Sequence, residues 1–258
     1  MEPSFYEFMD LFEKNITVEY IASELDCWNT NMETKEQAIK RMIKNEFDLI
    51  GIDDNGERCR CLNIKGEIRE IDIKGIISES TPLTYITQLF YDNLDRKLFI
   101  LKRKTLDGIV TKADLQKGPY CLFLFGLVTN LEITCLKFID KFCKDNWEEK
   151  ISQTRYDKIR EEYEKSSKEQ SELNLLFYTY LTDKKVILFK INEFSELYKE
   201  INLSKTKARR FFSRIIRLRN NLVHSKRINE NFKDWRDLLE TIRFIPLITS
   251  KMRGFLSD

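Results

Sequence analysis

The chain has 258 residues, of which 42% are hydrophobic and 33% charged, with eight glycines and four prolines. This composition predicts a helix-rich globular protein long enough for two domains, and it excludes a disordered chain. The first residues lack a cationic segment before an apolar run, and no stretch reaches about 18 uncharged apolar residues. We therefore expect neither secretion nor a membrane span, and we expect the protein to be cytoplasmic.

Charge is distributed unevenly along the chain. Residues 1–117 carry 17 basic and 22 acidic side chains, whereas residues 118–258 carry 27 basic and 20 acidic ones. The second part is therefore the better candidate for binding a polyanion. The six cysteines show no paired CxxC spacing and the chain has one histidine, so we expect no four-ligand zinc site.

The first 117 residues contain two copies of a helix–strand–turn–strand pattern. Hydrophobic periodicity and turn signals predict helices over 5–14 and 33–45, a strand over 47–52, a turn at 53–56, a strand over 59–64, a helix start at 80–83, a helix over 85–94, and strands over 97–102 and 106–111. The sequence of the turn, Asp53-Asp54-Asn55-Gly56, is typical of a β-hairpin.

This repeat resembles a tandem pair of CBS domains over about residues 15–117, and its sharpest match is the run Gly108–Asp114. The resemblance implies that Thr111 and Asp114 bind the ribose of an adenine nucleotide between the two copies. A hydroxyl and a carboxylate three residues apart, where a strand gives way to a helix, can face one sugar diol. The first copy has Asn63 and Gly66 at the matching positions, so at most one such site is expected. Alternatively, Thr111 caps the next helix and Asp114 adds favourable charge to its first turn.

From Gly118 onward, long helical patterns replace the strand signals. We therefore place a domain boundary near Gly118-Pro119, with an α+β domain over 1–117 and an all-α bundle over 118–258. The apolar spacing predicts helices over about 119–146, 148–181, 192–199, 205–224 and 231–253.

Two of these helices carry a charge on their apolar side. At about 100° per residue, Glu132 falls inside the apolar arc of the first helix and Arg219 inside that of the helix over 205–224. An isolated buried charge is costly, so we expect Glu132 and Arg219 to pair across the helix interface.

The single histidine, His224, lies in the most basic stretch of the chain. Between Lys205 and Arg227 there are nine Lys or Arg residues and no Asp or Glu, a charge pattern that attracts nucleic acid. Asn220 and His224 are four residues apart and share a helix face, whereas His224 lies about 140° around the helix from Arg219. The long side chain of Arg219, a helix that ends near Ser225, or the helix of a second protomer could bring these groups together.

The run Arg219-Asn220-Asn221-Leu222-Val223-His224 within a helical region resembles the HEPN superfamily, whose ribonucleases carry an Arg, then about four to six residues, then His on a late helix. The resemblance covers roughly residues 118–253. It implies cleavage of RNA without a metal or other cofactor, in a composite site made by two protomers. His224 would transfer a proton and Arg219 would stabilise phosphoryl charge. Asn220 would orient the imidazole or the substrate, and Glu132 would hold Arg219.

The flanking cations are expected to form an RNA-facing surface: Lys205, Lys207, Arg210, Arg214 and Arg217. Our hypothesis is a homodimeric, metal-independent endoribonuclease, regulated by an adenine nucleotide bound to the first domain and suited to a stress-response or antiphage toxin. Without any function, the basic residues would form a solvated helix face, and Arg219 and Glu132 would form a purely structural ion pair. A non-catalytic RNA-binding or nucleotide-sensing module is the other function class. A small-molecule enzyme is disfavoured because the sequence shows no Gly-rich phosphate loop and no Ser-His constellation.

Overall fold

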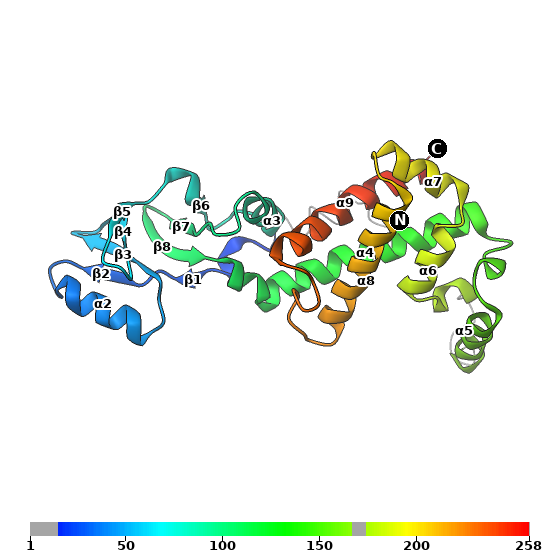
Figure 1. The fold of residues 1–258 in the computed structure, drawn as a ribbon, viewed down its shortest axis with the longest axis horizontal. Coiled ribbons are helices and arrows are strands. Elements are labelled where there is room, and N and C mark those ends of the chain that lie inside the picture. The colour runs from blue at the N-terminus through cyan, green and yellow to red at the C-terminus, as the bar shows by residue number, and fades with distance from the viewer. Residues whose placement is uncertain (1–14, 167–173, 258) are drawn as a thin grey trace. The chain divides into compact units, whose positions relative to one another are not determined.

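The computed structural model describes residues 15–166 and 174–257 (Figure 1). The helix predicted over 5–14 lies outside the described residues. The chain forms two compact units, residues 1–123 and 124–258. The division falls within the helix α4 (Gly118–Cys143), just after the boundary expected from the sequence. A part with two small mixed sheets is followed by a helical part, so the predicted order of an α+β region and an all-α region is confirmed.

The first unit is built from two four-stranded sheets with the same arrangement. One has the order β2-β3-β4-β5 and the other β6-β7-β8-β1, and in both the first two strands are parallel and the remaining neighbours antiparallel. The strands are β1 (Ser23–Glu24), β2 (Cys27–Asn29), β3 (Leu49–Asp54), β4 (Glu57–Asn63), β5 (Ile68–Glu70), β6 (Ile76–Ser78), β7 (Leu98–Lys102) and β8 (Thr105–Val110). In each sheet one helix connects the parallel strands, α2 (Lys35–Lys44) in the first and α3 (Leu83–Asp92) in the second. Both predicted copies of the helix–strand–turn–strand pattern are therefore present.

Local sequence signals account for the first copy. Asn55 and Gly56 both have positive φ, 53° and 90°, which is the backbone of a type I′ turn whose twist matches that of paired strands. At the start of α2, the Thr34 hydroxyl accepts from the Gln37 backbone, and the Gln37 side chain accepts from the Thr34 backbone. The apolar side of α2 packs on this sheet in a core of five buried residues: Ala38, Met42, Ile50, Ile52 and Leu62. Figure 1 shows α2 beside strands β2–β4.

The second unit is helical. Its helices are the larger part of α4, then α5 (Gln153–Ser166), α6 (Leu181–Leu188), α7 (Asn192–Glu200), α8 (Lys205–Val223) and α9 (Trp235–Ser257). The single helix expected over 148–181 is wrong, because α5 ends at Ser166 and a separate helix begins at Leu181. Polar side chains cap the later segments: Asn174 accepts from the Leu176 backbone, and Asp183 accepts from the Tyr180 backbone. Such local bonds compete with a continuous helix.

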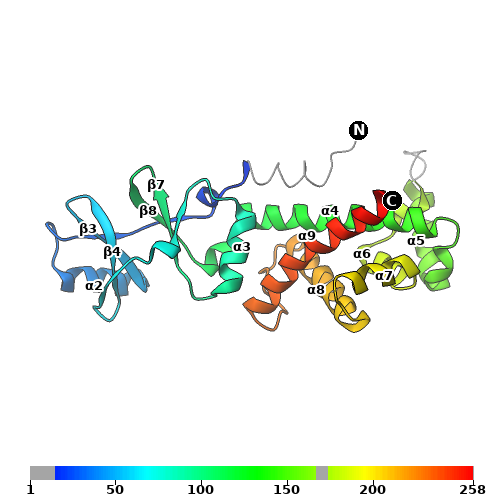
Figure 2. The ribbon, with the colours of Figure 1, turned by 90° about the horizontal axis from the view of Figure 1, so that it is seen from above.

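Helix α4 is a core helix. Among the described residues, it is the one helix long and apolar enough to span a membrane by length and composition, and 56% of its most apolar window is buried inside the fold. Its Phe138 lies 6.0 Å, ring to ring, from Phe194 of α7, which in turn lies 5.7 Å from Phe212 of α8. Helices α8 and α9 pack side by side, as both views show (Figure 2). This packing fixes α8, whose C-terminal end carries the predicted site.

Candidate functional site

The C-terminus of α8 is closed by a Schellman motif. The helix ends at Val223, His224 is the C-cap, and Ser225 has a φ of 52°. The Ser225 amide donates to the Leu222 carbonyl (3.3 Å), and the Lys226 amide donates to the Asn221 carbonyl (2.9 Å). Because glycine is the usual residue at the left-handed position, Ser225 holds this turn with some backbone strain. The turn leaves His224 exposed at the end of the helix.

Asn221 fixes the loop that follows His224. Its side chain is buried, and its amide donates to the carbonyls of Ile228 (3.3 Å) and Glu230 (2.8 Å). The sequence pattern predicts a role for Asn220 and none for Asn221. The signal was present, since Asn221 follows Leu218 by three residues and so continues the buried row of α8. A polar residue in a buried row needs a specific partner, and here the partners are backbone carbonyls.

The structure places the three predicted active-site residues of α8 within its last turns. Arg219 is half-buried, while Asn220 and His224 are exposed. Within residues 15–166 and 174–257, none of these three side chains forms an ion pair or a side-chain hydrogen bond. The guanidinium of Arg219 and the imidazole of His224 are therefore available to a ligand, although no hydrogen bond joins them to each other.

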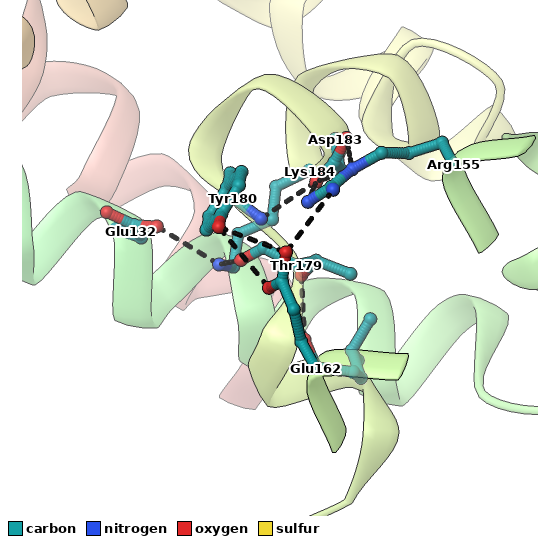
Figure 3. Close-up of polar contacts among 8 residues, drawn as sticks. Glu132, Arg155, Glu162, Thr179, Tyr180, Asp183 and Lys184 are labelled. Carbon is teal, nitrogen blue, oxygen red and sulfur yellow. Dashed lines mark hydrogen bonds and ion pairs between the residues drawn. The ribbon is translucent and has the colours of Figure 1, made fainter. Parts of the chain in front are cut away.

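The expected pair between Glu132 and Arg219 is wrong. The Glu132 Oε1 atom instead lies 3.1 Å from the Nζ of Lys184, which comes from α6 (Figure 3). Lys184 is only 3% exposed, and it also donates to the carbonyl of Thr179. A buried ammonium needs acceptors, and Glu132 supplies a charged one. The acid on α4 therefore holds α6 and not the arginine of α8.

A second polar cluster stabilises the start of α6. Arg155 of α5 donates from Nε (3.0 Å) and Nη2 (2.9 Å) to the carboxylate of Asp183 and stacks 4.5 Å from the ring centroid of Tyr180. The Tyr180 hydroxyl donates to Glu162 at 3.2 Å. Hydrogen bonding to Asp183 is the main cause that raises the pKa of Arg155. Figure 3 shows this cluster beside Lys184, so it fixes the start of α6 and thereby the partner of Glu132.

The five predicted RNA-facing cations differ in their partners. Arg214 pairs with Asp237 and with Glu240 (3.2 Å) of α9, so its charge is balanced inside the fold. Arg217 donates to the carbonyl of Asn231 and lies over the ring of Phe232. Arg217 is nevertheless exposed. The other three are exposed as well, and none forms an ion pair with another described residue: Lys205, Lys207 and Arg210. Those three remain available to a polyanion.

In the first unit, the carboxylate of Asp114 is already fully engaged. Its Oδ2 accepts from the amide (2.7 Å) and the hydroxyl (2.9 Å) of Thr111, and its Oδ1 accepts from the Ser23 hydroxyl (3.0 Å) and lies 2.8 Å from Lys117 Nζ. A carboxylate offers about four lone-pair positions. This geometry corresponds to the capping role considered above, because a ribose could bind Asp114 only by displacing one of these donors.

Thr111 and Asp114 nevertheless line a cavity of about 620 Å³. The other walls are Ser23–Asp26 at β1, the segment 46–49 before β3, the segment 94–97 before β7, and Ile109, Lys112 and Ala113. The segments before β3 and β7 occupy matching places in the two copies, so the cavity lies between the copies. Its volume is within the range of small-ligand sites.

No family model and no curated protein matches this chain. Among the described residues there is no group of three or more His, Cys, Asp or Glu side chains that could hold a metal ion. The expectation of metal-independent chemistry stays a prediction.

Proposed function

We propose that this protein is an endoribonuclease whose active site is formed by Arg219, Asn220 and His224. One observation carries the proposal. The single histidine, His224, is exposed at the C-terminus of α8, a helix without acidic residues. Close to it in the sequence, the half-buried Arg219 has no carboxylate partner among the described residues. The resemblance of the Arg219–His224 run to HEPN ribonucleases supports the same assignment.

The chemistry is a transesterification at phosphorus. The ribose 2′-oxygen loses its proton and bonds to the adjacent phosphorus, while the bond from phosphorus to the 5′-oxygen breaks and that oxygen gains a proton. The products end in a 2′,3′-cyclic phosphate and a 5′-hydroxyl. Arg219 would stabilise charge on the phosphoryl oxygens, and His224 would transfer one of the two protons. Asn220, which shares a face of α8 with His224, would orient the imidazole or the ribose.

Two proton transfers and one histidine per chain favour a site made by two protomers. The His224 of one protomer would act as base and that of its partner as acid. Glu132 has no part in this scheme, because it pairs with Lys184. We therefore assign Glu132 to the packing of α6 against α4.

The test is cleavage of a mixed-sequence RNA in the presence of a chelator. Wild type is expected to produce cyclic phosphate ends, and His224→Ala and Arg219→Ala are each expected to lose about 100-fold or more in rate, as is typical when a general acid–base group is removed. Arg227→Ala, which removes a nearby exposed arginine, is the matched control and should cleave like wild type. If wild type is inactive, or if His224→Ala cleaves equally well, the catalytic proposal fails; RNA binding without cleavage would favour a non-catalytic RNA-binding module.

The cavity of the first unit favours a second function, regulation by an adenine nucleotide. Its size, its position between the two copies and the presence of Thr111 on its wall support this role, as does the resemblance to CBS domain pairs. Thr111→Val removes one donor to Asp114 and leaves the other three in place. We expect it to weaken nucleotide binding in equilibrium dialysis, while Thr206→Val, at an exposed position in α8, leaves binding unchanged. Equal binding by both variants would contradict the assignment.

A further inference from the structure

Two further cations, Lys185 and Arg209, meet where α6 packs against α8. Lys185 of α6 donates from Nζ to the hydroxyl of Ser213 at 2.6 Å. Arg209, one turn before Ser213 on α8, has its guanidinium carbon 5.4 Å from the ring centroid of Phe189. The buried ring of Phe189 thus supports the guanidinium from one side. An ammonium, a hydroxyl and a guanidinium therefore lie together at this surface.

The charges of this group are not balanced within the fold. In the part of the chain that the structure describes, neither Lys185 nor Arg209 forms an ion pair. The pKa of Lys185 is lowered mainly by partial burial and, to a smaller extent, by the positive charge of Arg209. Two neighbouring cations without a carboxylate repel each other. An anion bound between them would remove that repulsion, and phosphate oxygens accept from both guanidinium and ammonium donors.

This group lies on the same side of α8 as Asn220 and His224 of the proposed active site, whereas Arg219 lies on another side. Arg209, Ser213, Asn220 and His224 follow each other at intervals of four, seven and four residues, which places them within about 60° of one another around the helix. Along the axis, Arg209 and Asn220 are separated by about 16 Å at 1.5 Å per residue. That distance is several times the axial spacing of about 3.4 Å per nucleotide in one strand of a duplex, so the two places contact different phosphates.

We propose that Lys185 and Arg209 form a phosphate-binding subsite that anchors a single RNA strand several nucleotides away from Asn220 and His224. Ser213 positions Lys185, and its own proton is donated to the Arg209 carbonyl (2.9 Å). The ligand is the phosphodiester backbone, so the subsite contributes affinity and register and does not read the base sequence. This inference rests on the proposed function for the identity of the polyanion. Its contacts, however, are independent of catalysis.

The test measures binding of a short 2′-O-methyl RNA, which cannot be cleaved through the 2′-oxygen, by the full chain at salt concentrations from about 50 to 200 mM. Each phosphate contact with a single strand contributes about −0.7 to the slope of log K against log salt concentration. We expect the double variant Lys185→Gln/Arg209→Gln to lose one phosphate contact, hence about 0.7 from that slope, and at least tenfold in affinity at the lowest salt. Lys185→Arg/Arg209→Lys keeps both charges and should keep most of the slope.

The matched control removes two exposed cations elsewhere in the same unit, Lys144→Gln/Lys199→Gln. It changes net charge equally and should leave the slope unchanged. The subsite is refuted if both glutamine doubles behave like wild type or lose the same amount of slope, provided circular dichroism shows that each is folded. If wild type does not cleave RNA but the slopes follow the expected pattern, the subsite stands and the ribonuclease proposal fails.

Discussion

Adjacent asparagines at the end of α8 have opposite environments. Asn221 is 3% exposed and donates to two loop carbonyls, whereas Asn220 is exposed. Asn221→Ala leaves these carbonyls without their donor, so we expect the free energy of unfolding to fall by about 1–3 kcal/mol. Asn220→Ala should change it by less than about 0.5 kcal/mol. Urea unfolding of the full chain measures both values, and equal losses would contradict the separation between a structural and a functional asparagine. Under the proposed function, Asn220→Ala also lowers the cleavage rate of the folded protein.

Ser225 carries a strain that a single substitution can remove. Its φ of 52° lies in the left-handed region, which costs an ordinary residue about 1–2 kcal/mol. Ser225→Gly removes this cost but also increases the freedom of the unfolded chain, so we expect a net gain of about 0.5–1 kcal/mol in the free energy of unfolding. Ser225→Ala keeps a Cβ atom and should bring no such gain. A thermal melt in which alanine stabilises as much as glycine would show that backbone strain is not the cause.

The residues of the candidate site were only partly predictable, for a geometric reason. A helical wheel predicts that Glu132 and Arg219 turn toward the interior, and both are partly buried. It does not show which helices face each other, and the partner of Glu132 proved to be Lys184. Lys184 lies in α6 (Leu181–Leu188), which the sequence pattern did not predict, because the expected helix over 148–181 ends where α6 begins. The same periodicity predicts that Asn221 is buried, because it follows Leu218 by three residues. It does not predict the loop carbonyls that Asn221 binds.

At the scale of elements, local signals decide what a sequence can predict. The Asn55-Gly56 turn and the apolar runs beside it were sufficient to place β3 and β4, and the helical spacing over 33–45 was sufficient to place α2. Strand β1 has two residues and β5 has three, too few for any periodicity to be visible. Strand β1 exists because Ser23 and Glu24 pair with Ile109 and Gly108, far away in the sequence. Such long-range pairing leaves no local trace.

The ion pair between α4 and α6 should stabilise the helical unit. Lys184→Met removes a 3% exposed ammonium and leaves Glu132, whose side chain is 25% exposed, without its cation. Removing the cation from a partly exposed carboxylate in this way costs about 1–3 kcal/mol. Glu132→Leu/Lys184→Met replaces both partners and should recover part of that loss. A double-mutant cycle based on urea unfolding measures the coupling; additive single and double effects would show that the pair contributes nothing.

Because Glu132 does not hold Arg219, Glu132→Gln should leave the cleavage rate of the folded protein near that of wild type.

At the scale of the whole molecule, the charge asymmetry seen in the sequence has a structural counterpart in each unit. The second unit carries Lys185 of α6 and several cations of α8 that pair with no carboxylate among the described residues. The cavity of the first unit is lined by six carboxylates and three cationic side chains, with a formal balance of −3. The sequence could show which half is basic. It could not show that acidic residues from several separate segments line one cavity, because that depends on how the two copies pack.

This acidic lining predicts an order of affinity among adenine ligands. Each added phosphate brings negative charge toward a lining of the same net sign, so we expect adenosine to bind more tightly than AMP, and AMP more tightly than ATP. A ligand that binds only the folded unit raises its free energy of unfolding by about 2.7 kcal/mol at 100 times its Kd. Thermal shift at low salt therefore ranks the three ligands at equal concentration, and added salt should reduce the differences because it screens the repulsion. The opposite order, with ATP as the strongest ligand, would mean that the three cationic side chains of the cavity direct binding and that the net charge of its lining does not.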